Sequence, residues 1–259
     1  METRVYRRIW RAAHRRSLHV LHWQRPGTVW AADFAQAPCL IDGQYRYVLA
    51  VRDLASGLQL LWQPVAAPTA EVLLTELPLL FARYGAPWVL KTDNGSAFIA
   101  DLVRWYLQHA LVDQLFSPPH CPEYNGSIEA AIGNHKQRTE RDSILSGHPG
   151  QWFSANLTAS SLQANTAHPR RLRGRTPLEA WQWRRPLTTA EQDQFRATVA
   201  QYRTEARHAH GLPIGAPLTR SLQAEVDREA IRRALVAHDL LLFQRRSIPP
   251  KITRAKLAI

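Results

Sequence analysis

The first regular hydrophobic pattern along the chain predicts three strands joined by tight turns. The strands are Val29–Ala37, Tyr45–Asp53 and Leu58–Val65, and the turn signals between them are Asp42-Gly43 and Ser56-Gly57. Consecutive strands with connections this short pair in an antiparallel arrangement. The middle strand is apolar almost throughout, which predicts a central place in the sheet.

In the first of these strands, an acidic residue interrupts an apolar face. Because successive side chains alternate between the two faces of a strand, Asp33 shares its face with Val29, Ala31 and Ala35. A carboxylate in such surroundings is costly unless it is paired or binds a metal ion. Asp33 is therefore the first candidate functional residue.

Helical and strand patterns alternate after the third strand. A helix opens at Pro68-Thr69 and ends near Gly85, and Pro78 is expected to kink or split it. The elements that follow are a strand at Trp88–Thr92, a helix starting at Ser96 or Asp101, a strand at Leu111–Phe116, a loop at Ser117–Gly126 and a helix carrying Glu129. This order predicts an α/β fold with a mixed five-stranded sheet flanked by helices.

Helical segments with many basic residues are expected at both ends of the chain. Residues 1–22 are interpreted as a basic helix or linker, and residues 23–147 as the core domain. A helical, Arg-rich extension of the core is expected over 148–186, and a helical region with a basic tail over 187–259. The helices expected there are Trp152–Ala167, two that start at the capping boxes Thr176–Glu179 and Thr188–Glu191, and one from Leu222 to Leu241.

The net charge of +12 is unevenly distributed. Residues 1–27 contain seven Arg and one acid, residues 28–135 contain five basic and ten acidic residues, and residues 136–259 contain 21 basic and ten acidic residues. An acidic centre between two basic flanks indicates a metal-binding region within a surface that binds a polyanion. The alternative is a solvated surface of a protein that is merely rich in arginine.

Several classes of protein are disfavoured by the sequence. No run approaches 18 apolar residues, and the basic N-terminus lacks the apolar block of a signal peptide, so we expect a soluble intracellular protein with no membrane partner. The only cysteines are Cys39 and Cys121, and their spacing is not that of a metal-ligand pair. His120 beside Cys121 does not make a zinc site by itself.

Two further acids have settings that resemble that of Asp33. Asp93 ends a short apolar run and enters an Asn-Gly turn, and Glu129 lies 36 positions later, just inside a helix. Carboxylate oxygens are hard ligands that suit Mg²⁺ or Mn²⁺. Our hypothesis is that the three acids converge on a pair of such ions.

Each acid also has a purely structural explanation. Asp33 could pair with an arginine, Asp93 could simply begin a turn, and Glu129 could be favoured by the dipole of its helix. The joint occurrence of all three, at this spacing, favours the metal site. We interpret Asp42, Asp53 and Asp101 as turn or cap residues.

These stretches resemble the DDE transposases and retroviral-type integrases, specifically the integrase-core group of bacterial insertion sequences. The resemblance covers about Trp23 to Trp183. Its carriers are Asp33 in WAADF, Asp93 in TDNGSAF, the run Pro122-Glu123-Tyr124-Asn125-Gly126, and Glu129 after the 35 intervening residues typical of the family. The segment from Asn165 to Trp181 resembles the one that follows the core in the same transposases.

The resemblance implies an RNase H-like catalytic core in which Asp33, Asp93 and Glu129 hold two Mg²⁺ or Mn²⁺ ions. It implies DNA 3′-end cleavage and strand transfer during transposition, with water and then a DNA 3′-hydroxyl as the nucleophile. The partners expected are transposon ends and target DNA, with a homo-oligomer on the DNA, in the nucleoid-associated cytoplasm of a bacterium. Two departures are that no helix-turn-helix or zinc module is visible upstream, and that Ala35 replaces a frequent hydroxyl residue.

Contacts with DNA are expected in three places. Lys136 lies nearly two helical turns after Glu129 and so projects from the same face, and related integrases place a DNA-contacting lysine at this spacing. The alternative for Lys136 is an ion pair with Glu140. The other expected contacts are Tyr124 and Asn125 in the loop, where local packing is the alternative, and Arg170, Arg171, Arg173 and Arg175, which would bind phosphates unless they form a solvated loop.

Two other functions remain open. An RNase H-like nuclease that only cuts would not need the long basic C-terminal region. A truncated or domesticated transposase could bind DNA without activity, although the three retained acids argue against decay of the site.

Overall fold

The structure is a computed structural model that describes residues 16–117, 126–212 and 216–248. Backbone contacts divide the chain into two units. One consists of the two ends of the chain, up to His22 and from Leu241, and the other is Trp23–Leu240. In the first unit, strands β1 (Arg16–Trp23) and β7 (Leu241–Ile248) form a two-stranded sheet.

The second unit is built on a five-stranded sheet with the order β4-β3-β2-β5-β6. The strands are β2 (Val29–Ile41), β3 (Tyr45–Asp53), β4 (Gln59–Val65), β5 (Val89–Thr92) and β6 (Asp113–Phe116). β2, β3 and β4 form the predicted antiparallel meander, whereas β5 and β6 run parallel to β2. The predicted mixed sheet is thereby confirmed.

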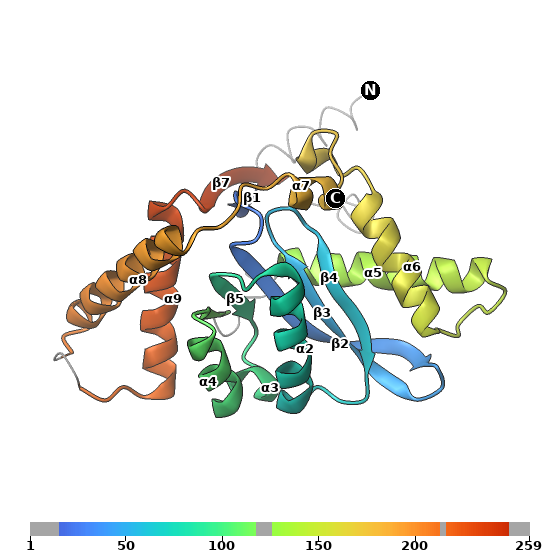
Figure 1. Cartoon of the computed structure of the whole chain (residues 1–259), viewed down its shortest axis with the longest axis horizontal. Coiled ribbons are helices and arrows are strands. Elements are labelled where there is room, and N and C mark those ends of the chain that lie inside the picture. Colours follow the sequence, from blue (N-terminus) through green and yellow to red (C-terminus); the bar gives the residue numbers. More distant parts are fainter. Residues whose placement is uncertain (1–15, 118–125, 213–215, 249–259) are drawn as a thin grey trace, which may run out of the picture. The chain divides into compact units, whose positions relative to one another are not determined.

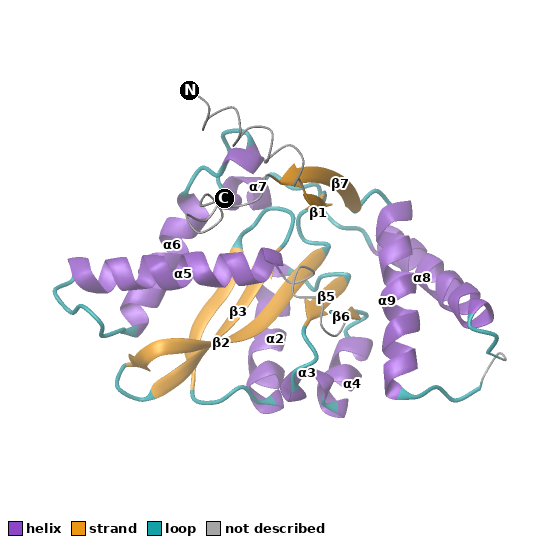
Figure 2. Ribbon diagram, turned by 180° about the vertical axis from the view of Figure 1, so that it is seen from behind, coloured by secondary structure: helices purple, strands orange, loops and turns teal. Residues whose placement is uncertain are grey.

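Helices cover both faces of this sheet. The helices α2 (Ala70–Tyr84), α3 (Ser96–Ile99) and α4 (Asp101–His109) lie on one face, and α5 (Gly126–Leu145) crosses the other (Figures 1 and 2). The helix α6 (Ser154–Thr166) packs against α5 and β4, and α7 (Pro177–Gln182) follows a short 3₁₀ turn at Arg170–Leu172. The C-terminal helices of the unit are α8 (Thr189–Ala209) and α9 (Arg220–Ala237).

The two faces of the sheet carry different side chains. The face toward α2 is apolar: Trp30, Leu49 and Leu90 are buried there against Leu73, Leu77 and Leu107. Burial of large apolar side chains of this kind is the main stabilising contribution to such a core. The face toward α5 instead carries Ala31 and Ala35 beside Asp33 on β2, and Arg52 and Lys91 on the neighbouring strands.

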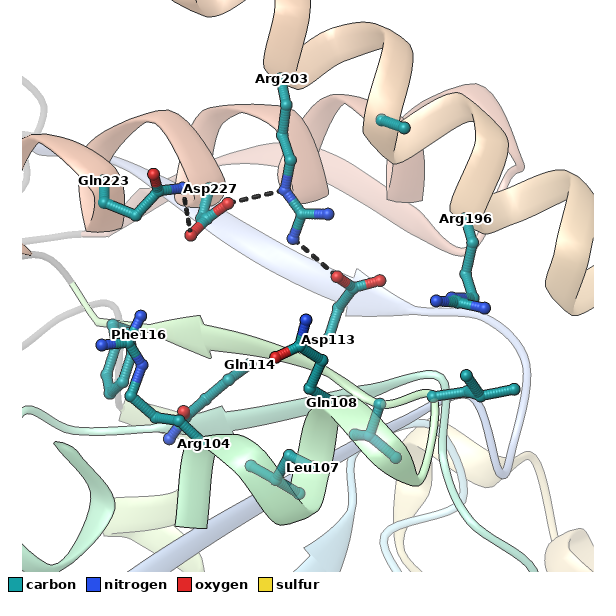
Figure 3. A pocket seen from close by; sticks show the side chains of 13 residues that line it. Arg104, Leu107, Gln108, Asp113, Gln114, Phe116, Arg196, Arg203, Gln223 and Asp227 are labelled. Carbon is teal, nitrogen blue, oxygen red and sulfur yellow. Dashed lines mark hydrogen bonds and ion pairs between the residues drawn. The ribbon is translucent and has the colours of Figure 1, made fainter. Parts of the chain in front are cut away.

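Helices α8 and α9 pack against each other and join the sheet through a network of ion pairs. Arg203 of α8 donates to Asp227 of α9 and to Asp113 of β6, beside a cavity of about 370 Å³ (Figure 3). A second cavity, of about 480 Å³, is lined by both α9 and the turn after β5, including Asn94 and Arg228. The C-terminal helices therefore reach the neighbourhood of the candidate site.

Some elements differ from the sequence prediction. Residues 16–23 form a strand, so the helix expected over 1–22 is wrong for that part, and Leu241–Ile248 is a strand where only a basic tail was expected. Pairing between the two ends of the chain, which no local pattern reveals, explains both. Helix α2 is assigned without interruption through Pro78, so the predicted split is wrong. Of the described residues, no helix is long and apolar enough to cross a membrane.

Candidate active site

Asp33 lies in the middle of β2, on the sheet face that α5 crosses. In the antiparallel pair, Asp33 is opposite Ala50, and two residues earlier on β2 Ala31 is opposite Arg52. On the parallel side, Ala31 is also paired with Lys91. Paired residues of neighbouring strands point to the same face, so an acid and two basic residues share this face with alanines. The predicted strand places Asp33 on the same face as Val29, Ala31 and Ala35, but the sheet face as a whole is not apolar, because Arg52 and Lys91 lie on it too.

Asp93 directly follows β5, in a turn that its own side chain helps to close. Its Oδ1 accepts a hydrogen bond from the backbone N–H of Gly95 at 2.9 Å. Asn94 donates from Nδ2 to the carbonyl oxygen of Ser117, at 2.9 Å, and so ties this turn to the end of β6. A side chain on Gly95 would begin 3.0 Å from Asp93 Oδ1, so glycine leaves the carboxylate unobstructed.

Glu129 lies in the first turn of α5, as predicted, and its side chain is exposed. The apolar stripe of α5, which includes Ile128 and Ile132, is buried and holds the helix against the rest of the unit. The expected loop contacts Tyr124 and Asn125, and the adjacent His120 and Cys121, lie outside the described residues.

The three acids interact electrostatically. The pKa of Asp33 is raised from 3.8 to about 7, first by burial, then by the negative charge of Asp93, and also by that of Glu129. The backbone N–H of Phe34 and the cation of Lys91 act in the opposite direction. Asp93 and Glu129 therefore lie near enough to Asp33 for their charges to act on it, although the three residues are far apart in the sequence.

Lys91 is a member of this site that sequence reasoning missed. It is buried on β5, with 3% of its surface exposed, and burial lowers its pKa from 10.5 to about 8 against the opposing effects of Asp33 and Glu129. Its Nζ donates to Ser117 Oγ at 3.4 Å. The available signal was a lysine inside an apolar strand, in a chain that has only four lysines.

The donor chemistry of the site suits a hard divalent cation. Carboxylate oxygens are the ligands that Mg²⁺ and Mn²⁺ prefer, and a cation would relieve the repulsion that raises the pKa of Asp33. Within the described ranges, no group of three His, Cys, Asp or Glu side chains is placed so that it could hold a metal ion. Asp33, Asp93 and Glu129 therefore fit a divalent cation by their charge and by their ligand type.

The expected DNA-contacting residues are placed on two elements. Lys136 is partly exposed on α5, and it makes no ion pair with a described residue. Its alternative partner Glu140 instead accepts hydrogen bonds from Trp152 Nε1 at 2.8 Å and from the backbone N–H of Gly150 at 3.2 Å. Because Glu140 is engaged in these hydrogen bonds, the Lys136 ammonium remains available to a ligand.

The arginine run around the 3₁₀ turn is not uniform. Arg170, Arg173 and Arg175 are exposed, and Arg175 lies over the Trp183 ring at 5.2 Å. Arg171 is also exposed as a residue, but its side chain reaches back to the core and donates from Nη1 to the carbonyl oxygen of Ala55 at 2.8 Å. The sequence predicted the same role for all four arginines, and only the structure distinguishes Arg171 from the other three.

Residues 24–122 match the family model of the integrase core domain. This match contains β2 to β6, with Asp33, Lys91 and Asp93. A Pol polyprotein of a radiation murine leukemia virus is 26% identical over 230 residues, which cover 85% of this chain and 38% of the polyprotein. A Gag-Pol polyprotein of feline leukemia virus is 26% identical over 216 residues, covering 83% of this chain and 12% of that one.

Solved structures show the same fold. A chain of the simian T-cell lymphotropic virus intasome, in complex with PP2A regulatory subunit B56 gamma, aligns with a TM-score of 0.56 at 17% identity, over 64% of this chain and 58% of that chain. The integrase catalytic core domain of HTLV-2, in complex with magnesium in a trimeric form, aligns with a TM-score of 0.50 at 16% identity, over 60% of this chain and 97% of that chain. The α/β fold is therefore the RNase H-like fold of integrase catalytic cores. The chain spans well under two thirds of the polyproteins it matches.

Proposed function

We propose that this protein is a DDE-type polynucleotidyl transferase, which cleaves DNA 3′ ends and joins them to target DNA. The observation that carries the proposal is the electrostatic coupling of Asp33 to Asp93 and Glu129 within an integrase-core fold. Within this class, we propose the transposase of a bacterial insertion sequence, acting in the nucleoid-associated cytoplasm. The assignment to a bacterial insertion sequence is supported by the sequence motifs around Asp33, Asp93 and Glu129.

The three acids would hold two divalent ions, Mg²⁺ or Mn²⁺. When bound, such a pair activates the attacking oxygen and stabilises the leaving 3′ oxygen of an in-line displacement. The role of the protein is to position the carboxylates: Asp33 on a central strand, Asp93 in a turn that is closed by Gly95, and Glu129 at the start of a helix. No covalent intermediate with the protein is required.

Lys91 has a positioning role in this proposal. Its ammonium lies among the acids and donates to Ser117, the residue at which the loop towards α5 begins. A buried cation stabilises adjacent carboxylates in their charged form, and the hydrogen bond holds the end of β6 beside β5. Lys91 would thereby keep the acids ionised and fix the start of the loop.

DNA is the proposed partner, as transposon ends and as target. Lys136 follows Glu129 by seven residues, or about 10 Å along the helix axis, and would contact a phosphate near the reacting end. The exposed arginines Arg170, Arg173 and Arg175 would add contacts that are independent of sequence. By analogy with the intasome and the trimeric core among the similar structures, a homo-oligomer is the proposed form on DNA.

A strand-transfer assay tests the proposal directly. The purified chain is incubated with a labelled duplex carrying the terminal sequence of the element, plasmid DNA and Mg²⁺ or Mn²⁺. We expect nicking at the 3′ end and labelled, joined product. Nicking without joining would support the nuclease that only cuts, and DNA binding with neither product would support an inactive relic.

A further inference from the structure

Arg52 occupies an unusual position for an arginine. It lies on β3, opposite Ala31, on the same sheet face as Asp33. Its pKa is lowered from 12.5 to about 10, first by burial and then by the positive charges of Arg171 and Arg138, against the opposing effect of Asp53. No hydrogen bond or ion pair joins the Arg52 guanidinium to any residue in the described part of the chain.

A second guanidinium lies directly against that of Arg52. A Cβ added to Gly57 would meet Arg171 Nη2 at 1.8 Å and Arg52 Nη2 at 2.7 Å, so both nitrogens lie over this one glycine. The positive φ of Gly57, 77°, belongs to the turn that carries it between β3 and β4. Arg171 is fixed in place by its bond to the carbonyl of Ala55. Two cations are thus held together by the fold.

The nearest acid cannot neutralise this pair through hydrogen bonds. Asp53 is fully buried, and its Oδ1 accepts from the backbone N–H of Gly27 at 2.8 Å. Its Oδ2 accepts from the backbone N–H and the hydroxyl of Ser56, at 2.7 and 2.6 Å. Asp53 exerts only a through-space attraction on Arg52 and Arg171. The cluster therefore keeps a positive charge without a hydrogen-bonded counter-ion.

The cluster opens onto a basic cavity. Arg171 lines a cavity of about 700 Å³ whose wall contains six arginines and no acidic residue: Arg25, Arg171, Arg173, Arg175, Arg184 and Arg185. Arg25 and Arg185 are paired with Glu191. The other four make no ion pair with a described residue. Trp183 adds a ring that is 66% exposed to the same wall.

The cluster and the three acids share two elements of the fold, the helix α5 and the β2–β3 pair. Arg138 follows Glu129 on α5 by nine residues, which at 3.6 residues per turn is two and a half turns, so the two side chains leave opposite sides of the helix. Figure 2 shows α5 lying across the sheet face. Glu129 and Arg138 therefore leave opposite sides of α5, whereas Asp33 and Arg52 lie on the same sheet face, on the neighbouring strands β2 and β3.

We infer that Arg52, Arg138 and Arg171 form a binding site for a backbone phosphate of DNA, with the adjacent arginine-lined cavity receiving the neighbouring nucleotides. Guanidinium groups bind phosphate oxygens through charge-assisted, often bidentate hydrogen bonds, and an anion would remove the repulsion between the paired cations. The exposed ring of Trp183 can stack on a base. The choice of DNA as the polyanion rests on the proposed function.

Arg52→Met tests the site, because it removes the charge and keeps a side chain of similar length. Thermal unfolding is followed without metal, with and without inorganic phosphate. We expect Arg52→Met to be at least as stable as the natural protein in phosphate-free buffer, and to lose the rise in Tm that phosphate causes. A lower Tm for the variant together with an unchanged response to phosphate would overturn the proposed phosphate site, because both results would show that Arg52 stabilises the fold and does not bind the anion. Arg46→Met, on the same strand and the same face but exposed, is the matched control.

Binding of a DNA duplex, measured by fluorescence anisotropy in EDTA over a series of salt concentrations, identifies the ligand. Loss of one phosphate contact should weaken binding about tenfold at low salt and reduce the slope of log affinity against log salt by about one. Arg138→Gln, partly exposed on α5, is the second variant if Arg52→Met does not fold. An unchanged slope in both variants overturns the DNA assignment. A lost phosphate response with unchanged DNA binding also overturns it, leaving a site for a small anion.

The same measurements separate this inference from the proposed function. If the natural protein shows no strand transfer but Arg52→Met still changes the salt slope, the proposed function fails and the phosphate site stands. If strand transfer occurs and neither variant changes DNA binding, the proposed function stands and the phosphate site is wrong.

Discussion

Arg203 Nη2 lies 2.7 Å from Asp113 Oδ1, and this ion pair attaches the C-terminal helix α8 to the edge strand β6 (Figure 3). The same guanidinium donates from Nε to Asp227 Oδ1 of α9 at 2.6 Å. One side chain therefore joins three elements that are separated by up to 114 positions of sequence. Since α9 also donates from Arg228 to the carbonyl oxygen of Phe116, the helices support the end of β6 next to the candidate site.

Arg203→Met should destabilise the protein, because it leaves two partly buried carboxylates without their partner. Solvent still reaches Arg203, so the loss should be below that of a fully buried pair, about 1–3 kcal/mol in the free energy of unfolding. Urea unfolding measures it. Arg196→Met is the control: Arg196 lines the same cavity from the same helix and makes no ion pair with a described residue. Equal losses in both variants would contradict a specific role for Arg203.

Asp33→Asn, Asp93→Asn and Glu129→Gln should each abolish cutting and joining and leave DNA affinity almost unchanged. Each substitution removes a charged metal ligand, whereas removing negative charge near DNA cannot weaken binding. Product formation with Mg²⁺ and anisotropy in EDTA measure the two effects. Asp193→Asn, an exposed acid in the first turns of α8, should change neither. Strand transfer near the natural level in any one of the three variants would remove that acid from the site.

Lys136→Ala should weaken binding to a transposon end and slow joining, with little change in stability. Lys136 makes no ion pair with a described residue, so its removal costs the fold little, whereas loss of one phosphate contact reduces the salt slope by about one. Gln137→Ala, the exposed neighbour on α5, is the control. Crosslinking from position 136 to the terminal nucleotides is the direct test, and its absence in an active complex would rule out the contact.

His135 should make the protein less stable in acid. It is buried on α5 against Trp62 and Ser160, and its pKa is lowered from 6.5 to about 3, first by burial and then by the charges of Arg52 and Arg138. Between these two values the unfolded chain binds more protons than the folded one, so the free energy of unfolding falls as the pH falls through this window. At pH 5 the loss should be about 2 kcal/mol relative to pH 7.5.

Urea unfolding at pH 7.5 and pH 5 measures this effect. His135→Gln loses packing at both values, but its stability should depend less on pH than that of the natural protein. His208→Gln, exposed near the end of α8, should keep the natural dependence. The same pH dependence in all three proteins would show that His135 does not titrate as the structure indicates.

Much of the fold and part of the site could be predicted from sequence because the signals are local. The strand Tyr45–Asp53 has the predicted bounds, the helix α8 starts at its predicted capping box, and the turn at Asp42-Gly43 joins β2 and β3. Asp33 was identified because period two alone places it on an apolar face. These features depend on neighbouring residues, so their causes are visible in a short stretch of chain.

Tertiary structure decided the rest, because the causes lie in residues distant in sequence. Residues 16–23 appear helical by themselves, yet they form a strand because a partner strand lies more than 200 positions away. Lys91 became part of the site only when β5 paired with β2 and faced α5. Arg52 and Arg171, 119 positions apart, form a cluster only because the turn at Gly57 brings their side chains together. The sequence by itself determined which acids are available, and the pairing of strands and packing of helices determined which charges they meet.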